Sequence, residues 1–159
     1  MRAIALILVS FMSLGAWAVG TQEQPDRNDR IYNLTGAVGL KGYDPVSYFP
    51  EGGSQPQMGN MNFAGQYGNV VYYFASEAHR QMFFAEPTKY EPTYGGWCAW
   101  AMANQSYADI DPMLFTLNGR RLHFFISRGA KARFDRDLIN RETAADNFWR
   151  SESGEMPRF

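Results

Sequence analysis

The only cysteine of the chain lies in the segment YGGWCAWAM, residues 94–102. A thiolate is a nucleophile and a soft metal ligand. One cysteine cannot form an internal disulfide, so Cys98 is a buried thiol, a metal ligand, a reactive nucleophile or half of a bridge that links two chains. Gly95 and Gly96 have no Cβ, which would let a ligand or another backbone come close to the thiol.

Two imidazoles and one nearby thioether are the other donors that could act with the thiol. The chain has two histidines, His79 and His123, and Met102 follows Cys98 in the same segment. Thiolate, imidazole and thioether donors suit a soft, low-coordinate ion such as Cu(I). We therefore take Cys98, His79, Met102 and His123 as candidate metal ligands, with copper as the candidate ion and no other cofactor.

Three of the four candidate ligands, Cys98, His79 and His123, also have a structural explanation, which stays open. Free cysteines often behave as small buried hydrophobes, so Cys98 could pack between its neighbouring tryptophans. His79 falls on a predicted helix beside apolar residues, at the edge of a core. Strand alternation places His123 on the same face as Arg121 and Phe125, a face that could meet solvent.

The sequence offers little for catalysis. Cys98 with His79 or His123 could form a nucleophile–base pair, but no motif of a known cysteine hydrolase surrounds the thiol. No C-x-x-C-H haem motif and no G-x-G-x-x-G motif occur. Asp44, in Gly-Tyr-Asp-Pro, favours a turn cap over a catalytic acid. We predict no catalytic residue, and a thiol-dependent enzyme that uses Cys98 ranks last among the functions considered.

The N-terminus has the pattern of a cleaved signal peptide over residues 1–18. Arg2 supplies a basic start, an apolar run follows, and Ala-Trp-Ala at 16–18 matches an A-x-A cleavage signal. The apolar run is shorter than the about 20 residues that a bilayer span needs. We expect an exported protein, periplasmic or secreted, with no membrane contact after cleavage.

The 141 residues that would follow cleavage suit one domain. Removing Arg2 leaves 14 Lys and Arg against 16 Asp and Glu, a net charge near −2. Since no basic block stands out, nucleic acid is not an expected partner. The expected partner is a metal ion or a protein, and a dimer linked through Cys98 stays open.

Local patterns predict several elements in the first part of the domain. The β-branched and aromatic run VVYYF predicts a strand over 70–74. Ser76 is a candidate N-cap for a helix over 76–86, which Pro87 would end. Residues 55–69 are rich in turn formers and predict a loop.

The second part of the domain contains the clearest local signal. Asn118-Gly119 predicts a type I′ turn in a hairpin over 114–127. Residues 97–103 favour a strand, and 128–138 and 142–151 favour helices.

These elements together predict a small single α+β domain with short antiparallel strands and about three helices. We divide the chain into a flexible leader over 19–38, a domain over 39–151 and a tail over 152–159, and no internal repeat is visible. One core is expected to hold six aromatic residues: Phe74, Phe83, Tyr90, Tyr94, Trp97 and Trp149.

Several of these segments together resemble the secreted YHS-domain proteins. The resemblance covers roughly residues 40–150 and includes GYDPVSYF at 42–49, VYYFASEAHRQMF at 71–83, EPTKYEPTYGGWCAWAMA at 86–103 and FWR at 148–150. That family is related to a smaller metal-binding module of the YHS/TRASH kind, found in proteins that handle copper and other heavy metals. The resemblance implies a compact α+β fold and a metal role, and it leaves the activity open.

The chain departs from that smaller module at the metal ligands. The module has cysteines after a D-P-V segment and in an F-C-S-x-x-C segment, where this chain has Ser47, Ala75 and His79. A four-thiolate zinc site is therefore excluded by ligand count. His79 stands at a former ligand position, and Cys98 and His123 could add to it, which suits Cu(I) better than a structural zinc ion.

Three functions follow from these observations. The favoured one is an exported YHS-type binding protein that holds a soft metal ion such as copper through Cys98 and His79. The alternative is a metal-free structural or protein-interaction module with an aromatic-rich surface. The third is the thiol-dependent enzyme. A short distance between His79 and the Cys98 sulfur would favour the first.

Overall fold

The computed structural model describes residues 27–158, and it has four α-helices and two sheets within that range. The predicted signal peptide and the first part of the leader lie outside the described residues. The strands are β1 (Leu34–Thr35), β2 (Val38–Gly39), β3 (Asn60–Tyr67), β4 (Val70–Phe74), β5 (Asp111–Asn118) and β6 (Arg121–Phe125). The helices are α1 (Glu77–Ala85), α2 (Ala99–Ala103), α3 (Arg128–Asp135) and α4 (Leu138–Ser153). The predicted α+β class is confirmed.

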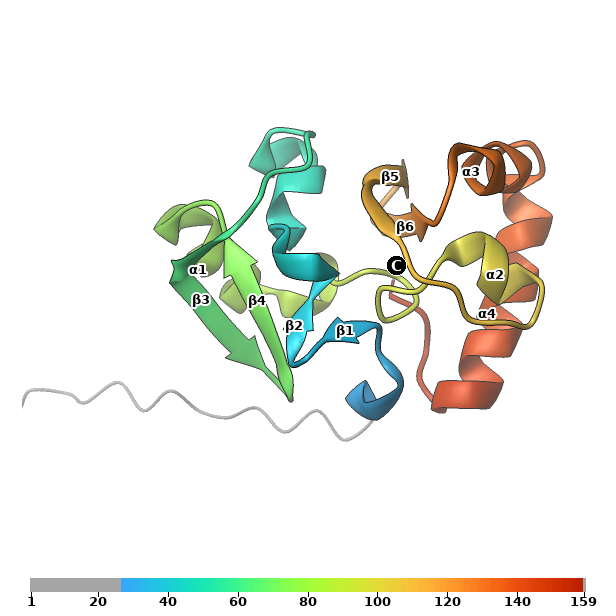
Figure 1. Ribbon diagram of the computed structural model, residues 1–159, viewed down its shortest axis with the longest axis horizontal. Coiled ribbons are helices and arrows are strands. Elements are labelled where there is room, and N and C mark those ends of the chain that lie inside the picture. The colour runs from blue at the N-terminus through green and yellow to red at the C-terminus, as the bar shows by residue number, and fades with distance from the viewer. Residues whose placement is uncertain (1–26, 159) are drawn as a thin grey trace, which may run out of the picture.

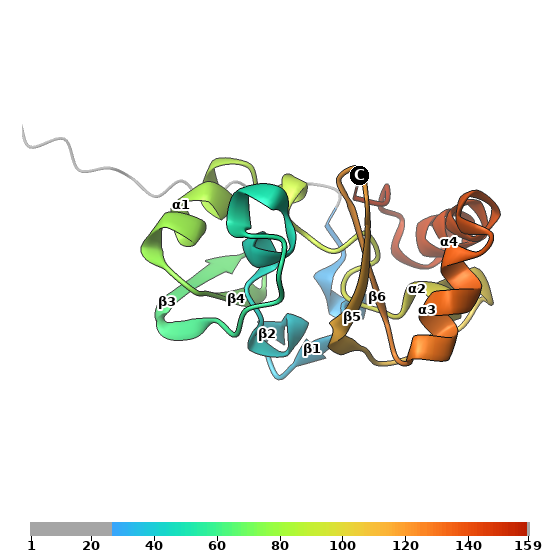
Figure 2. The ribbon, with the colours of Figure 1, turned by 90° about the horizontal axis from the view of Figure 1, so that it is seen from above.

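The elements form two groups along the long axis of the molecule (Figures 1 and 2). One group contains the four-stranded sheet, with strand order β1-β2-β4-β3, and helix α1. The other contains the β5–β6 hairpin with α2, α3 and α4. Within the described residues, no helix is both long enough and apolar enough to cross a membrane. One continuous hydrophobic core joins the two groups.

The same chain path occurs twice, which the sequence did not reveal. In each case an eight-residue strand, a two-residue turn and a five-residue strand lead into a helix. We call β3–β4–α1 the first module (residues 60–85) and β5–β6–α3 the second module (residues 111–135). Corresponding residues differ by 51 in number. The backbone path therefore repeats, although no internal repeat is visible in the sequence.

The residues that the two modules share are those that the path itself requires. Gly68 and Gly119 begin the two turns, with φ of 59° and 61°. Ser76 and Ser127 cap the two helices, and each hydroxyl accepts a hydrogen bond at 3.2 Å from the backbone N–H three residues later. The core pairs also match: the ring centroids of Phe74 and Phe83 lie 5.2 Å apart, and those of Phe125 and Phe134 lie 5.3 Å apart.

The expected strand over 97–103 was wrong, because only its start pairs with a strand. Cys98 forms a single parallel bridge with Phe124, and the backbone N–H of Met102 then donates to the Cys98 carbonyl at 3.0 Å. Three alanines in α2 favour helix once that turn has formed. The chain therefore has one α-helix more than expected among the described residues.

The predicted elements around the two turns are confirmed with two corrections. Strand β4, helix α1 and the β5–β6 hairpin match the predictions, but residues 60–67 of the expected loop form β3. Asn118 pairs with Arg121, so the turn residues are Gly119 and Arg120, and of these two only Gly119 has a positive φ. This is the pattern of a type II′ turn, so the expected type I′ turn was wrong.

The expected leader and tail were wrong wherever the structure describes them. A buried group of charges, the terminal charge cluster (Arg27, Glu91, Glu155 and Arg158), ties both ends of the described chain to its middle. Arg27 Nη1 lies 2.5 Å and Arg158 Nε 3.2 Å from Glu91, whose side chain is 1% exposed. A carboxylate buried to this extent requires cationic partners, so the pairs hold Arg27 and Arg158 in place.

The aromatic core is confirmed, with Trp97 partly buried at its margin. Trp149 on α4 is 1% exposed, and its ring packs near the rings of Tyr32 and Tyr94. We expect Trp149→Ala to lower the free energy of unfolding by about 3–5 kcal/mol, because it opens a large cavity. Denaturant unfolding checks this. Met156→Ala, at a 65% exposed position, should change stability by no more than about 0.5 kcal/mol, and equal effects of the two substitutions would contradict the packing described.

Candidate functional site

Cys98 is completely buried, and so is Met102. The structure gives both residues an exposed fraction of 0%. Among the described residues the thiol makes no hydrogen bond, and Cys98 is a free cysteine at the start of α2. Neither sulfur can meet an ion from solvent unless the second half of the molecule opens.

His79, by contrast, forms a polar pair with Asp44 near the surface. Nδ1 of His79 lies 2.5 Å from Oδ2 of Asp44, whose side chain is fully buried, while the side chain of His79 is 15% exposed. The same carboxylate accepts hydrogen bonds at 2.8 Å from the backbone N–H groups of Val46 and Ala75. Asp44 is therefore the turn cap that the sequence predicted, and it also holds an imidazole.

A strained turn delivers Asp44 to this position. Leu40, Lys41 and Gly42 all have positive φ, at 51°, 53° and 84°. For the two residues with side chains this conformation costs of order 1–3 kcal/mol each. Directly after the turn, the Asp44 backbone N–H donates to the carbonyl of Gln57 at 2.9 Å.

The pairing with Asp44 defines the free nitrogen of the His79 ring. A carboxylate that accepts from Nδ1–H leaves Nε2 of a neutral imidazole with a lone pair. No described residue forms a hydrogen bond with Nε2, and that atom is not among the buried unpaired atoms. The ring can therefore bind a metal ion or accept a hydrogen bond from a partner. A carboxylate behind the ring is also the usual support of a metal-ligating histidine.

His123 is buried, so the expectation of a solvent-facing strand face was wrong. Helix α4 covers this face: His123 Nε2 lies 2.6 Å from Glu142 Oε1. The ring of Tyr94 stacks on the imidazole at 5.4 Å, and the ring of Phe134 packs at 5.1 Å. Nδ1 is buried and has no partner among the described residues.

The electrostatics of this pair keep the imidazole neutral and the carboxyl ionised. Burial lowers the pKa of His123 below its ordinary value, and it outweighs the opposing effect of the hydrogen bond that His123 donates to Glu142. Burial alone would raise the pKa of Glu142, but hydrogen bonds from His123 and Asn118 lower it.

Each module forms a buried hydrogen bond with a glutamate that follows it in the chain, but the donor side chain differs. Tyr72 corresponds to His123 and Glu91 to Glu142, since both pairs of positions differ by 51 in number. The Tyr72 hydroxyl donates to Glu91 at 2.8 Å, just as the imidazole meets Glu142. His123 therefore occupies a structural position of the module, where burial is the rule.

Cys98 occupies the position beside the second module that Asp44 occupies beside the first, although these two residue numbers differ by 54. Both residues are N-caps with nearly the same backbone, φ −72° and ψ 115° for Asp44 and φ −62° and ψ 117° for Cys98. Their N–H groups donate to Gln57 and Ala108, which again differ by 51 in number. Ala130 takes the place of His79, so the second module has no imidazole beside its cap residue.

The structure thus separates the four candidate ligands. His79 lies on α1 at one end of the molecule, Cys98 and Met102 lie at α2 in the other group, and His123 is closed off by α4 (Figures 1 and 2). In the part of the chain that the structure describes, no cluster of three or more His, Cys, Asp or Glu side chains could hold a metal ion.

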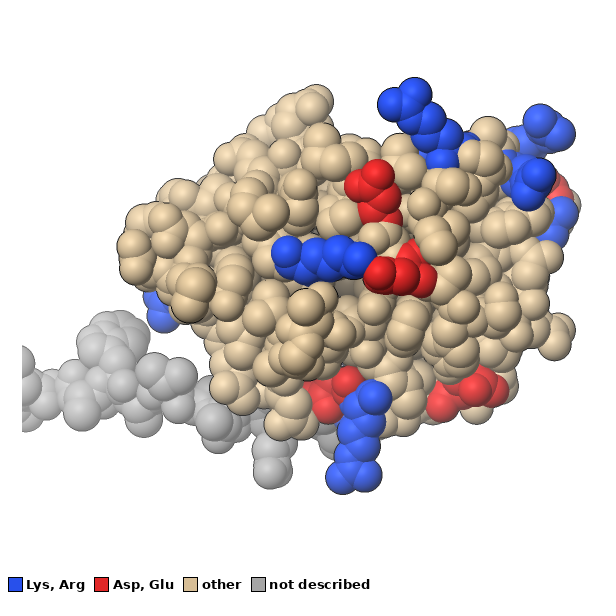
Figure 3. Space-filling model, viewed as in Figure 1, with Lys and Arg blue, Asp and Glu red and all other residues tan. Residues whose placement is uncertain are grey.

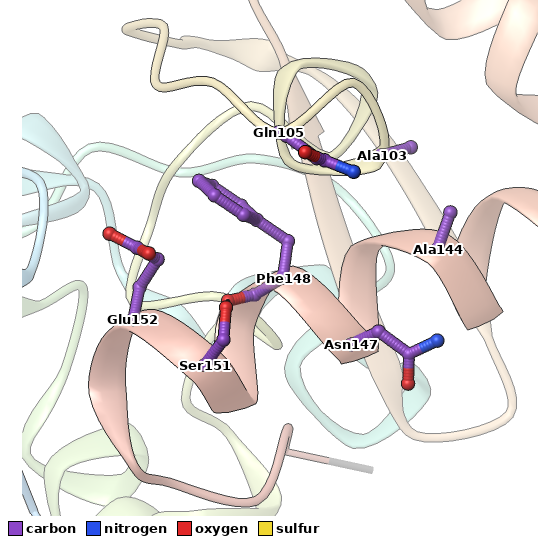
Figure 4. A pocket seen from close by; sticks show the side chains of 7 residues that line it. All are labelled: Ala103, Gln105, Ala144, Asn147, Phe148, Ser151 and Glu152. Carbon is purple, nitrogen blue, oxygen red and sulfur yellow. The ribbon is translucent and has the colours of Figure 1, made fainter.

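An open hollow between α2 and α4 is the other concave feature of note (Figure 4). It measures about 470 Å³. Its lining is largely polar and comes from Ala103, Gln105, Ala144, Asn147, Phe148, Ser151 and Glu152. None of the candidate ligands lines it.

A comparison with models of protein families, with curated proteins and with solved structures gives no significant match.

The burial of Cys98 predicts a structural role for the thiol. Cys98→Ser should lower the free energy of unfolding by roughly 1–3 kcal/mol, because the new hydroxyl would be buried without a partner. Denaturant unfolding measures this. The native thiol should also react slowly with an aromatic disulfide reagent and quickly after unfolding. Fast reaction of the folded protein would contradict the burial.

The neutral His123 predicts a loss of stability in acid. The unfolded chain binds a proton at this histidine near pH 6.5 and the folded chain does not, so the free energy of unfolding should fall as the pH drops below about 6.5. His123→Tyr copies Tyr72 of the first module and should remove this slope between about pH 7 and 5. Unfolding curves at several pH values check this, and the same slope in both proteins would contradict it.

Proposed function

We propose that this protein is an exported, YHS-type binding protein without catalytic activity, whose ligand contacts the imidazole of His79. The ligand that fits best is a copper ion. The observation that carries this proposal is the Asp44–His79 pair, in which a buried carboxylate holds Nδ1 and leaves Nε2 free.

The burial of Cys98 changes the form of copper that suits the chain. The expectation of Cu(I) depended on a thiolate donor, and this thiol is 0% exposed. An imidazole with oxygen donors suits Cu(II), and nitrogen and oxygen sites bind Cu(II) more tightly than Zn(II).

One imidazole cannot complete a copper site, so the remaining ligands must come from water or from a partner that carries the ion. Such an open coordination sphere suits a protein that passes an ion on and does not store it. The strained turn before Asp44 is consistent with this role, since strain of this kind gathers at functional sites.

A second candidate is a metal-free protein-interaction module. The observation in its favour is that α1, the helix of His79, also exposes Met82 at 37% and Phe84 at 38%. In that case Nε2 of His79 would accept a hydrogen bond from the partner.

Calorimetric titration of the mature protein with Cu(II) and Zn(II) tests the proposal. We expect one Cu(II) ion per chain and weaker Zn(II) binding. His79→Ala should abolish copper binding, and Asp44→Asn should weaken it by about 10–100-fold, the usual effect of losing the support of a histidine ligand.

Two matched variants serve as controls for this titration. Cys98→Ala and His123→Tyr change the other candidate donors and should bind Cu(II) as the wild type does. Copper binding that survives His79→Ala, or that Cys98→Ala removes, would overturn the assignment. No Cu(II) binding by the wild type would leave the metal-free candidate.

A further inference from the structure

The corner where α3 meets α4 carries an excess of basic side chains. Residues 128–141 contain five Lys and Arg and two Asp, a net charge of +3, whereas the rest of the sequence carries −4. Blue side chains gather over α3 at the upper right of Figure 3. We call this surface, residues 128–141 with Trp100, the basic corner.

Three of the five basic side chains in this segment form no ion pair with a described residue. Lys131 pairs with Asp135 at 2.5 Å, and Arg141 pairs with Asp137 at 3.7 Å. Arg128, Arg133 and Arg136 are exposed, and none of the described carboxylates lies within ion-pair distance of them. Three exposed guanidinium groups at this corner therefore have no ion-pair partner among the described residues.

The first module shows that the fold does not require these charges. The corresponding helix α1, residues 77–85, contains one Arg and one Glu, so its net charge is zero. The cap serine and the core phenylalanine are the same in both modules. Since the structural residues agree and the charges differ, the basic corner calls for a functional explanation.

Apolar side chains lie within the same corner. Ile139, near the start of α4, is 69% exposed. The half-buried ring of Trp100 has the Arg141 guanidinium at 4.8 Å and the Arg133 guanidinium at 6.0 Å. Basic side chains beside exposed apolar and tryptophan side chains are the composition of surfaces that rest in the headgroup region of a membrane.

We propose that, contrary to the expectation from the sequence of no membrane contact after cleavage, the basic corner docks this protein on the surface of an anionic phospholipid membrane. The arginines would contact lipid phosphates, and Ile139 would enter the headgroup region. Without Arg2, the rest of the mature chain has a net charge near −5 (−2 minus +3) and would be repelled from the same surface, so the protein would be held by this end. His79 lies on α1, in the other group of elements, and would stay accessible (Figures 1 and 2).

Vesicle co-sedimentation of the mature protein tests the proposal. The probes are vesicles of phosphatidylcholine alone and vesicles with ~30% phosphatidylglycerol, each at about 0.05 and 0.5 M salt. We expect binding only to the anionic vesicles, and only at low salt. Each basic side chain near such a surface strengthens binding by about fivefold, so the triple substitution Arg128→Gln, Arg133→Gln, Arg136→Gln should weaken it on the order of 100-fold.

Matched variants separate the corner from general charge and apolarity. Arg30→Gln with Arg150→Gln removes exposed charges elsewhere and should weaken binding much less. Ile139→Ser should weaken binding, and Met156→Ser, at a 65% exposed position, should not. Circular dichroism confirms that each variant is folded.

Several outcomes would overturn the proposal. They are equal binding to both vesicle types, no binding by the wild type, and no effect of the triple substitution. Polyglutamate and inorganic phosphate distinguish other anions. If polyglutamate binds the corner as tightly as the vesicles do and Ile139→Ser has no effect, the corner recognises an acidic protein. If low concentrations of phosphate displace the vesicles, it is a phosphate site.

Discussion

A buried carboxylate needs hydrogen-bond or ion-pair partners. The partners of three buried carboxylates, Asp44, Glu91 and Glu142, position much of this structure. Glu91 is 1% exposed and receives Arg27, Arg158 and the hydroxyl of Tyr72. Glu142 receives His123. An unpaired buried charge would cost several kcal/mol. These pairs therefore fix the positions of Arg27 and Arg158, of α4 and of the second hairpin.

The buried carboxylate of Asp44 is also fully paired, but one of its partners, His79, reaches the surface. Two of its hydrogen bonds come from backbone N–H groups, and the third comes from His79, whose ring reaches the surface. The carboxylate is satisfied internally, but the imidazole is not. This difference separates the first module, which keeps a free polar atom, from the second, where Cys98 and Ala130 fill the corresponding positions with apolar contacts.

The two modules share the residues that their backbone path requires and differ in the side chains around them. The turn glycines, cap serines and core phenylalanines are held in place by backbone and packing requirements. The positions around them are free to change, as the replacement of Tyr72 by His123 shows. The buried imidazole in the second module is thus a variation of a structural hydrogen bond.

Local chemistry made much of the fold predictable. Ser76, Pro87 and Gly119 act on their immediate neighbours, so the first helix and the hairpin could be placed from the sequence. Helix α2 was missed because its N-cap is a cysteine whose side chain makes no cap hydrogen bond. The repeat was missed because few identical residues mark it.

The pairing of Asp44 with His79 and of Arg27 with Glu91 could not be predicted from the sequence, for a different reason. Asp44 and His79 are 35 residues apart, and Arg27 and Glu91 are 64 apart. No periodicity or spacing signals such pairs. The resemblance to the metal-binding module matched Ser47 to one of that module's cysteine ligands. The carboxylate that contacts His79 belongs to Asp44, three residues earlier in the chain.

Pulsed electron paramagnetic resonance of the Cu(II)-loaded protein can establish whether His79 binds copper, since it detects the distal nitrogen of a copper-bound imidazole. We expect the signal of a single imidazole that is present in the wild type, in Cys98→Ala and in His123→Tyr, and absent in His79→Ala. An imidazole signal that persists in His79→Ala, or an absorption band from a copper–thiolate bond, would contradict it.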